Sequence, residues 1–159
     1  MILADKIQEL ILSKGWNDVV IQDEENQSSS VNFRYNINEQ SFSVFIDTDE
    51  ARDAVKFYIQ APFNVLAKQV NEMALLLNRI NIETPMGSFV VYPDGTLIWR
   101  HSIDFENIEP STVSLDNNMG AGINCFREWF EEISAVALTK TTAQDIFDEL
   151  EDEETPDEI

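Results

Sequence analysis

The chain has 159 residues, of which 43% are hydrophobic and ten are Phe, so it is long enough to bury the core of one domain. Its net charge of −20 predicts that it binds neither nucleic acid nor an anionic membrane. The single cysteine, Cys125, excludes an intrachain disulfide, and the early charges Asp5 and Lys6 interrupt any signal peptide. Together these features favour the cytoplasm.

The negative charge is concentrated toward the C-terminus. Residues 1–140 carry 21 acids against 10 bases, and residues 141–159 add nine acids and no base. This charge would attract a basic partner, although the simpler interpretation is that it keeps the protein soluble. We predict a single domain over residues 1–140 and an acidic, disordered tail over residues 141–159. The tail places Ile146, Phe147 and Leu150 at the spacing of one helical face, which would suit folding on a basic groove. The ordinary alternative is a solvated tail whose like charges repel one another.

The first segment, 2–14, repeats apolar residues at the spacing of a helix with one buried face. These residues are Leu3, Ile7, Leu10 and Ile11. Gly15 follows where a glycine in the left-handed conformation commonly ends a helix. The apolar stretch 16–21 predicts a short edge strand, and the polar stretch 23–30 predicts a loop.

Three segments then alternate between apolar and polar residues, which is typical of antiparallel strands with one buried face. Their apolar positions are Val31, Phe33, Tyr35 and Ile37, then Phe42, Val44 and Ile46, then Val55, Phe57 and Ile59. The connections at 38–40 and 48–53 are short, which indicates a meander.

A second helix and a hairpin follow. The helix is predicted from a buried stripe formed by Leu66, Val70, Met73, Leu77 and Ile80. The hairpin pairs residues 88–92 with 96–103 around Pro93-Asp94-Gly95. A third helix covers 123–138, but Met119-Gly120-Ala121-Gly122 interrupts the pattern before it and leaves its start undefined.

The element order is helix, three or four strands, helix, two strands, helix, which predicts an α+β fold with an antiparallel sheet flanked by helices. Within residues 71–106, the second helix ends with Asn-Arg-Ile-Asn (78–81), and the hairpin follows almost at once. In this order, residues 5–138 resemble the YbjN-like family, which is described as bacterial sensory transduction regulators. The resemblance implies a fold like that of type III secretion chaperones and names no activity. The 119–122 stretch and the acidic tail depart from the family's pattern.

His101 is the only histidine. It shares the apolar side of its predicted strand with Leu97 and Trp99, which is typical of a partly buried, hydrogen-bonded histidine. Ser102 and Asp104 face the other way, so these residues cannot form a local catalytic triad with it.

Other candidates for chemistry are equally weak. Cys125 lies in a predicted helix that carries no histidine, so we interpret it as a packing residue and not a nucleophile. Segment 47–53 resembles a calcium loop only faintly, because it contains no glycine for the turn and Tyr58 stands where a bidentate Glu belongs. The sequence therefore predicts no catalytic residue, no metal site and no cofactor, and we do not expect an enzyme.

The second and third helices carry more apolar residues than one buried stripe requires. The additional positions are Leu75 and Leu76 on the second helix and Trp129 and Val136 on the third. We predict that these four residues form a protein interface, most simply in a homodimer, as is typical of type III secretion chaperones, which the chain resembles. The competing interpretation is that Trp129 covers the domain's own core.

The sequence thus favours a non-catalytic protein-binding function, as a chaperone-like or regulatory adaptor with a protein or peptide partner. The alternative is a small-molecule or signal-sensing regulator with a pocket between the second helix and the sheet. An enzyme of an unrecognised type comes third.

Overall fold

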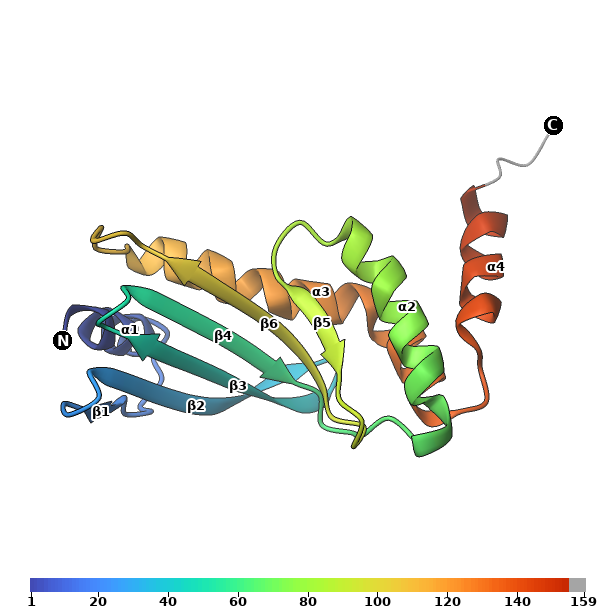
Figure 1. Ribbon diagram of the computed structural model, residues 1–159, viewed down its shortest axis with the longest axis horizontal. Coiled ribbons are helices and arrows are strands. Elements are labelled where there is room, and N and C mark those ends of the chain that lie inside the picture. Colours follow the sequence, from blue (N-terminus) through green and yellow to red (C-terminus); the bar gives the residue numbers. More distant parts are fainter. Residues whose placement is uncertain (155–159) are drawn as a thin grey trace.

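The computed structural model describes residues 1–154 and contains a six-stranded antiparallel sheet in the order β1-β2-β3-β4-β6-β5 (Figure 1). The strands are β1 (Ile21–Asp23), β2 (Ser28–Ile37), β3 (Gln40–Asp49), β4 (Ala54–Gln60), β5 (Ser88–Val91) and β6 (Leu97–Asp104). The helices are α1 (Ile2–Ser13), the short 3-10 helix η1 (Ala67–Gln69), α2 (Val70–Glu83), α3 (Thr112–Leu138) and α4 (Ala143–Glu154). The predicted α+β class, with an antiparallel sheet flanked by helices, is confirmed, and the predicted element order is approximately right.

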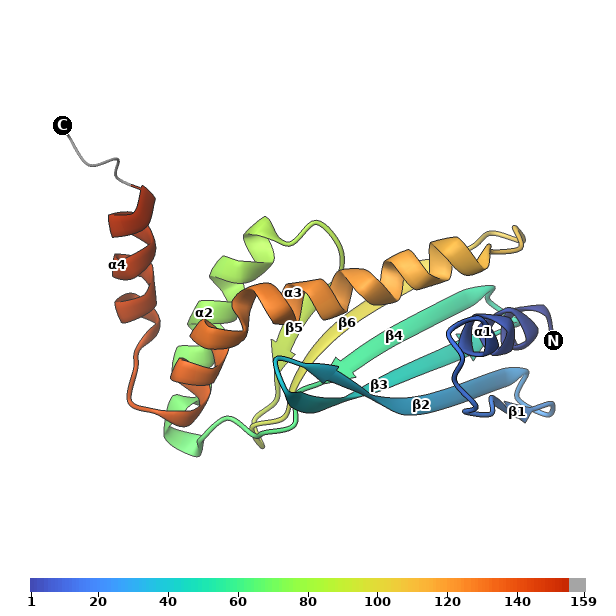
Figure 2. The same cartoon turned by 180° about the vertical axis from the view of Figure 1, so that it is seen from behind.

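Helices α1 and α3 cover one face of the sheet, α2 packs beside β5, and the other face of β2, β3, β4 and β6 is open. Figure 2 shows α3 running across the covered face with α1 beside it, whereas Figure 1 shows β2, β3, β4 and β6 with no helix in front of them. The alternating apolar positions predicted for these strands point to the covered face, where Val44, Ile46 and Phe57 are fully buried. The core therefore lies between this face and α1 and α3, and it extends to α2, whose Met73 and Ile80 are fully buried.

Helix α3 is longer than the sequence indicated, because the 119–122 stretch does not interrupt it. A Cβ added to Gly122 would collide with the ring of the buried Trp99, so this glycine allows α3 to lie close against β6. A Cβ added to Gly120 would meet nothing within 4 Å. The helix is thus continuous from Thr112, and the glycines mark a close packing point and an open surface rather than a break.

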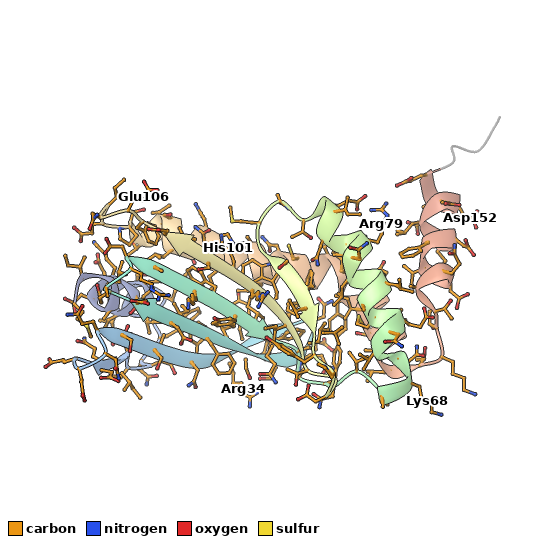
Figure 3. All side chains as sticks on the ribbon, viewed as in Figure 1. Arg34, Lys68, Arg79, His101, Glu106 and Asp152 are labelled. Atoms are coloured by element: carbon orange, nitrogen blue, oxygen red, sulfur yellow. The ribbon has the colours of Figure 1, made fainter. Side chains whose placement is uncertain are left out.

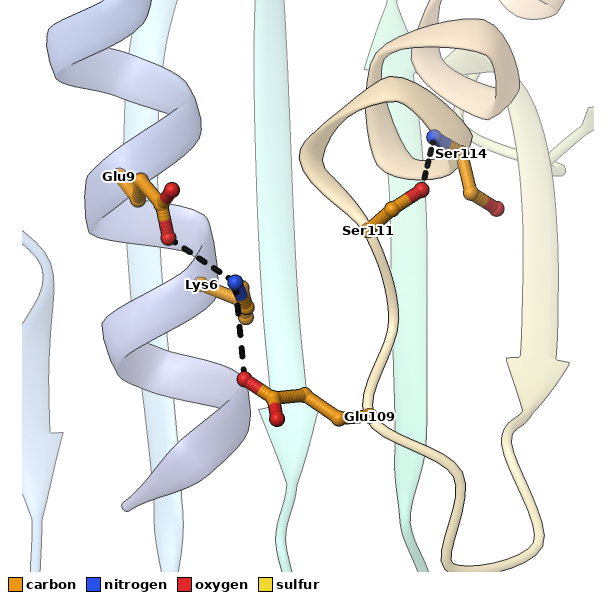
Figure 4. A network of polar contacts seen from close by, with 5 residues as sticks. All are labelled: Lys6, Glu9, Glu109, Ser111 and Ser114. Atoms are coloured by element: carbon orange, nitrogen blue, oxygen red, sulfur yellow. Dashed lines mark hydrogen bonds and ion pairs between the residues drawn. The ribbon is translucent and has the colours of Figure 1, made fainter.

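The start of α3 is fixed by local polar contacts (Figure 4). Ser111 Oγ caps the helix by accepting a hydrogen bond from the Ser114 N–H at 3.0 Å. Just before the cap, Glu109 Oε1 lies 3.5 Å from Lys6 Nζ of α1, which also lies 3.1 Å from Glu9 Oε2. The hydrogen bond and charge of Glu9, with a smaller contribution from Glu109, raise the pKa of Lys6. These contacts tie the segment before α3 to α1.

The connection between α1 and the sheet differs from the prediction. Gly15, at φ 75°, ends α1 as expected, with the Trp16 N–H bonded to Ile11 O at 3.2 Å. The predicted strand over 16–21 is wrong, because only Ile21–Asp23 pairs with β2. Gln8 explains this difference, since its side chain accepts from the Val20 N–H and donates to Asp18 O, which holds the segment along α1.

The acidic C-terminal segment also differs from the prediction, since residues 143–154 form α4 rather than a disordered tail. Thr142 and Asp145 build a reciprocal cap, with the Thr142 N–H bonded to Asp145 Oδ2 and the Asp145 N–H bonded to Thr142 Oγ1. Glu72 of α2 accepts from the Ala143 N–H at 2.8 Å, and Ala143 and Ile146 are buried. The remainder of the predicted tail, residues 155–159, lies outside the described residues.

Candidate functional site

The two outer edges of the sheet differ in their capacity to pair with another strand. At the β5 edge, the alternation of the ladder directs the backbone N–H and C=O of Phe89 away from β6. The Phe89 N–H donates to Asn81 Oδ1 at 2.8 Å, and Asn81 Nδ2 donates to Phe89 O at 3.0 Å. The Asn81 side chain therefore occupies the place of a further strand and closes this edge at Phe89.

The β2 edge is open. β1 pairs only with Ser28–Ser30, and within residues 1–154 no strand pairs with the outer side of the rest of β2. Ile37 and Gln40 flank a two-residue turn, Asn38-Glu39, in which both residues have positive φ. In such a hairpin the flanking residues, here Ile37 and Gln40, form a hydrogen-bonded pair. By alternation, three residues then direct their N–H and C=O groups outward: Asn32, Arg34 and Asn36. Figure 3 shows Arg34 at this outer margin, where β2 can accept another strand.

A groove of about 530 Å³ lies beside the β2 edge, between α1, β2 and the first half of α3. We call it the β2 groove. Trp16 and Tyr35 line it with half-buried rings, whose centroids lie 6.2 Å apart in an edge-on arrangement. Met119 and Ile123 line it from α3, beside the open space at Gly120. The apolar character of the groove thus comes largely from its two half-buried aromatic rings, since Met119 and Ile123 are themselves buried.

Polar groups complete the lining of the β2 groove. Lys14, which directly follows α1, places its Nζ 2.8 Å from Asp116 of α3 and so links the end of α1 to α3. Arg127 donates to Asn124 Oδ1 at 3.0 Å, and both residues are exposed. These groups can hydrogen-bond to the backbone of an extended peptide, while the apolar part accepts its side chains.

The structure places the four predicted interface residues in different environments. Leu76 and Val136 are fully buried within the chain, so their assignment to a surface is corrected. The physical reason is that α3 contacts α2 as well as the sheet, and Gln69 Nε2 at the start of α2 donates to Val136 O at 2.9 Å. Trp129 is half-buried against the core, whereas Leu75 is 58% exposed on α2.

The candidates for chemistry occupy structural positions. His101 is half-buried, with Nε2 3.2 Å from Asn118 Oδ1, so its prediction as a partly buried, hydrogen-bonded residue is confirmed. Burial raises the pKa of the half-buried Cys125 thiol, and the charge of Glu128 adds to this effect, which lowers the fraction of reactive thiolate. Within residues 1–154, no group of three or more His, Cys, Asp or Glu is placed to hold a metal ion.

A small groove lies where the sequence suggested a pocket between the second helix and the sheet. It measures about 250 Å³ and is lined by α2 and β5, with Ala74, Leu77, Asn78, Asn81, Phe89 and Val91 around it. This volume is below the range of about 300–1,000 Å³ that is usual for small-molecule sites. No helix of the described chain has the length and apolar character needed to cross a bilayer.

Comparison with protein families identifies the chain. The model of the YbjN family, described as "Putative bacterial sensory transduction regulator", matches residues 3–135. The chain belongs to the YbjN family. The match ends before α4, so the C-terminal helix of this YbjN-family chain lies outside the family pattern. The comparison with curated protein sequences found no match.

Three solved structures share the fold. A chain of the HopA1–SchA chaperone–effector complex is 17% identical to this chain, with a TM-score of 0.56. The match covers 82% of this chain and 94% of that chain. YbjN from E. coli, described as a putative transcription regulator, is 14% identical, with a TM-score of 0.53 and coverages of 80% and 91%. An uncharacterized Methanothermobacter thermautotrophicus protein is 10% identical, with a TM-score of 0.56 and coverages of 84% and 97%. The predicted resemblance to the YbjN family and to a type III secretion chaperone-like fold is confirmed.

Sequence reasoning missed the residues that distinguish the two sheet edges in this YbjN-family chain. Asn81 stood in the quoted Asn-Arg-Ile-Asn run, but its contact with Phe89 depends on how α2 packs against β5. Trp16 and Tyr35 come from separate segments and meet only after folding. The available signal was Trp16, an aromatic residue directly after the helix-ending Gly15.

Proposed function

We propose that this chain is a non-catalytic binding protein of the cytoplasm that captures an extended segment of a partner protein along the β2 edge. The observation that carries the proposal is the open edge at Asn32, Arg34 and Asn36 directly beside the β2 groove. Backbone hydrogen bonds to such an edge supply affinity, and pockets for alternate side chains supply specificity.

The geometry of strand addition determines where the partner's side chains lie. Successive side chains of a strand point to opposite faces, so every second residue of an added strand falls on the side of Phe33 and Tyr35. That is the covered side of the sheet, where the β2 groove lies. Large apolar residues at these alternate positions would contact Trp16 and Tyr35, because aromatic surfaces are common anchors of interfaces.

The charge of the chain favours a basic partner segment. With a net charge of −20, the protein attracts a cationic segment over several ångströms and repels an acidic one. A protein partner is also supported by the HopA1–SchA chaperone–effector complex, in which a chain of the same fold is found with a protein. The proposed ligand is therefore an extended, basic segment with apolar residues at alternate positions.

We also propose that two copies associate through the outer side of α2. Its exposed residues are Asn71, Ala74, Leu75, Asn78, Ile82 and Glu83, of which only Glu83 is charged. Leu75 is 58% exposed and Ile82 is 73% exposed, and they lie two turns apart on one stripe. Because this surface carries a single charge, two acidic chains can approach each other there with little local repulsion.

A substitution at one edge residue tests the strand-addition proposal. Arg34 directs its N–H outward, so Arg34→Pro removes that donor without breaking the ladder with β3, because proline is tolerated at strand edges. Arg34→Ala is the matched control, since it removes the same charge and keeps the N–H. Peptides selected from a random display library against the wild type are labelled, and their affinity is measured by fluorescence anisotropy.

We expect the selected peptides to be basic with alternating apolar residues. Their binding should weaken about fivefold in Arg34→Pro and by less than twofold in Arg34→Ala, because the backbone hydrogen bond that proline removes contributes about 1 kcal/mol. Gly120→Leu should also weaken binding, because it fills the open space of the β2 groove on a helix that tolerates the larger residue. The proposal would be refuted if Arg34→Pro, Arg34→Ala and Gly120→Leu all bound the peptides as tightly as the wild type, or if no peptide could be selected.

A further inference from the structure

A second concave site lies on the open face of the sheet, away from the β2 groove. It has a volume of about 400 Å³ and lies where β5 ends beside β4 and β6. The residues that line it are Lys56, Tyr58, Gly87, Ser88, Arg100, His101 and Ser102. We call it the Arg100 pocket, and its volume falls within the usual range of about 300–1,000 Å³ for small-molecule sites.

The charge of the Arg100 pocket is opposite to that of the whole chain. The protein carries 30 acids and 10 bases, yet two bases and no acid line this pocket. Within residues 1–154, neither Lys56 nor Arg100 forms an ion pair closer than 4.0 Å. Asp47 lies opposite Lys56 on β3 and offsets part of its charge, whereas Arg100 lies opposite the uncharged Tyr58 and Ser88. A positive centre therefore remains at Arg100.

Residues with hydrogen-bond donors lie next to this positive centre. The register places Lys56 opposite Ser102 and Tyr58 opposite Arg100, with Ser88 on the other side of Arg100. Three hydroxyl-bearing residues thus lie beside the two basic residues on one face of the sheet. Ser102 also lies beyond the last residue pair with β5, so the alternation of the ladder turns its backbone N–H toward the free margin of β6. The pocket offers donors from side chains and backbone.

The wall of the Arg100 pocket is held in place before any ligand binds. Trp99 Nε1 donates to Met86 O at 3.1 Å and anchors the connection between α2 and β5. Gly87 has φ 70°, and a side chain at this position would collide with Trp99 and with Arg100 O. This connection therefore lies tightly against β6, and its position needs no ordering when a ligand enters.

We propose that the Arg100 pocket binds the phosphate group of a small molecule. A guanidinium group donates two parallel hydrogen bonds to phosphate, an ammonium group adds a point charge, and three hydroxyls can serve the remaining oxygens. The net charge of −20 does not prevent this, because at physiological salt the screening length is about 8 Å and a small anion responds to the nearest charges. A nucleic acid, in contrast, extends across the acidic surface and is repelled. This ligand site is independent of the proposed strand addition.

Two-dimensional amide NMR of the full chain tests the proposal with inorganic phosphate and glycerol 3-phosphate, each compared with sodium chloride at equal ionic strength. Citrate serves as a carboxylate probe. Arg100→Gln and Lys56→Gln remove the two cations separately. Arg34→Gln is the matched control, because Arg34 is also exposed on the open face but lies on β2 and does not line the pocket.

We expect saturable shifts in the millimolar range or below, centred on the amides of Ser88, Arg100 and Ser102. Arg100→Gln should weaken binding about tenfold and Arg34→Gln less than twofold, since a charge-assisted hydrogen bond is stronger than a neutral one. If inorganic phosphate and glycerol 3-phosphate both give saturable shifts at the same residues, the site recognises the phosphate group. Tighter binding of glycerol 3-phosphate would indicate that the ligand is a phosphate ester. Preference for citrate, shifts equal to those in chloride, or equal losses in Arg100→Gln and Arg34→Gln would overturn the proposal.

Discussion

The contact between Asn81 and Phe89 provides a quantitative test of the sheet edge. Asn81→Ala removes both hydrogen bonds to the Phe89 backbone, and Phe89 is only 2% exposed, so its freed groups gain little contact with water. At about 1 kcal/mol for each bond, the free energy of unfolding should fall by about 2 kcal/mol. For a chain of this size, that loss corresponds to a decrease in Tm of about 4–8 °C.

Asn78→Ala is the matched control for this measurement. Asn78 lies three residues earlier on α2, is exposed, and has no side-chain hydrogen bond within residues 1–154. Both substitutions replace asparagine by alanine within one helix, so both gain the same helix propensity of several tenths of a kcal/mol. The difference between the two variants therefore isolates the contact with Phe89.

Thermal unfolding followed by circular dichroism measures both variants, and hydrogen exchange locates the effect. The Phe89 amide should exchange faster in Asn81→Ala and remain protected in Asn78→Ala. Equal Tm values for the two variants, with the Phe89 amide still protected, would refute the inference that Asn81 closes the β5 edge.

Three further predictions follow from the helices. Gly122→Ala should lower the free energy of unfolding by about 1–3 kcal/mol, because the new methyl group meets the indole ring of Trp99. Gly120→Ala should instead raise it by up to about 1 kcal/mol, because its new methyl group meets nothing. Chemical denaturation of both variants measures the two effects. The hydrogen bonds from the Thr142 N–H and hydroxyl lower the pKa of Asp145. The ionised Asp145 carboxylate therefore stabilises α4 above the usual Asp pKa, and this stabilisation is lost as pH falls through the lowered value. NMR shifts of α4 should show this transition, and Asp145→Ala should abolish it. Leu75→Glu should convert a homodimer into a folded monomer of unchanged helix content in light scattering and circular dichroism, and a monomeric wild type would contradict the proposed α2 interface.

The sheet was predictable because its pattern is local. Each of the segments around Val31, Val44 and Phe57 alternates strictly, and a period of two defines both a strand and its buried face. The second helix was predictable for the same reason, since a stripe from Met73 to Ile80 needs no partner to be recognised. Local periodicity therefore determines the elements and their faces.

The errors occurred where a distant residue decides the local structure. Gly122 by itself indicates a helix break, whereas the structure shows that a glycine is needed there because the indole of Trp99 leaves no room for a side chain. The acidic segment after residue 142 indicates disorder by composition, and the capping box together with Glu72 explains why it forms α4. The threonine and aspartate of that cap were visible in the sequence, so this signal was available.

The candidate surfaces were less predictable than the fold. Leu76 and Val136 looked like surplus apolar residues because the sequence does not show that α2 and α3 pack on each other as well as on the sheet. The Arg100 pocket depends on cross-strand register, which brings together Lys56, Arg100 and Ser88 from three strands. Composition gives the net charge of a chain but not the sign at one position on its surface.

The contrast between the two sheet edges limits how this protein can bind a strand. If both edges were open, each copy could pair with two others, and edge-to-edge pairing would continue without closure. Asn81 occupies the backbone groups of Phe89 at one edge, so strand addition along the full length of the sheet is confined to β2. The charged Arg34 on that edge disfavours pairing between two copies of β2, because like charges would face each other in the new ladder. An acidic or uncharged residue of a foreign strand would meet Arg34 without this repulsion. The same edge thus discriminates against self-association and remains available to a different chain.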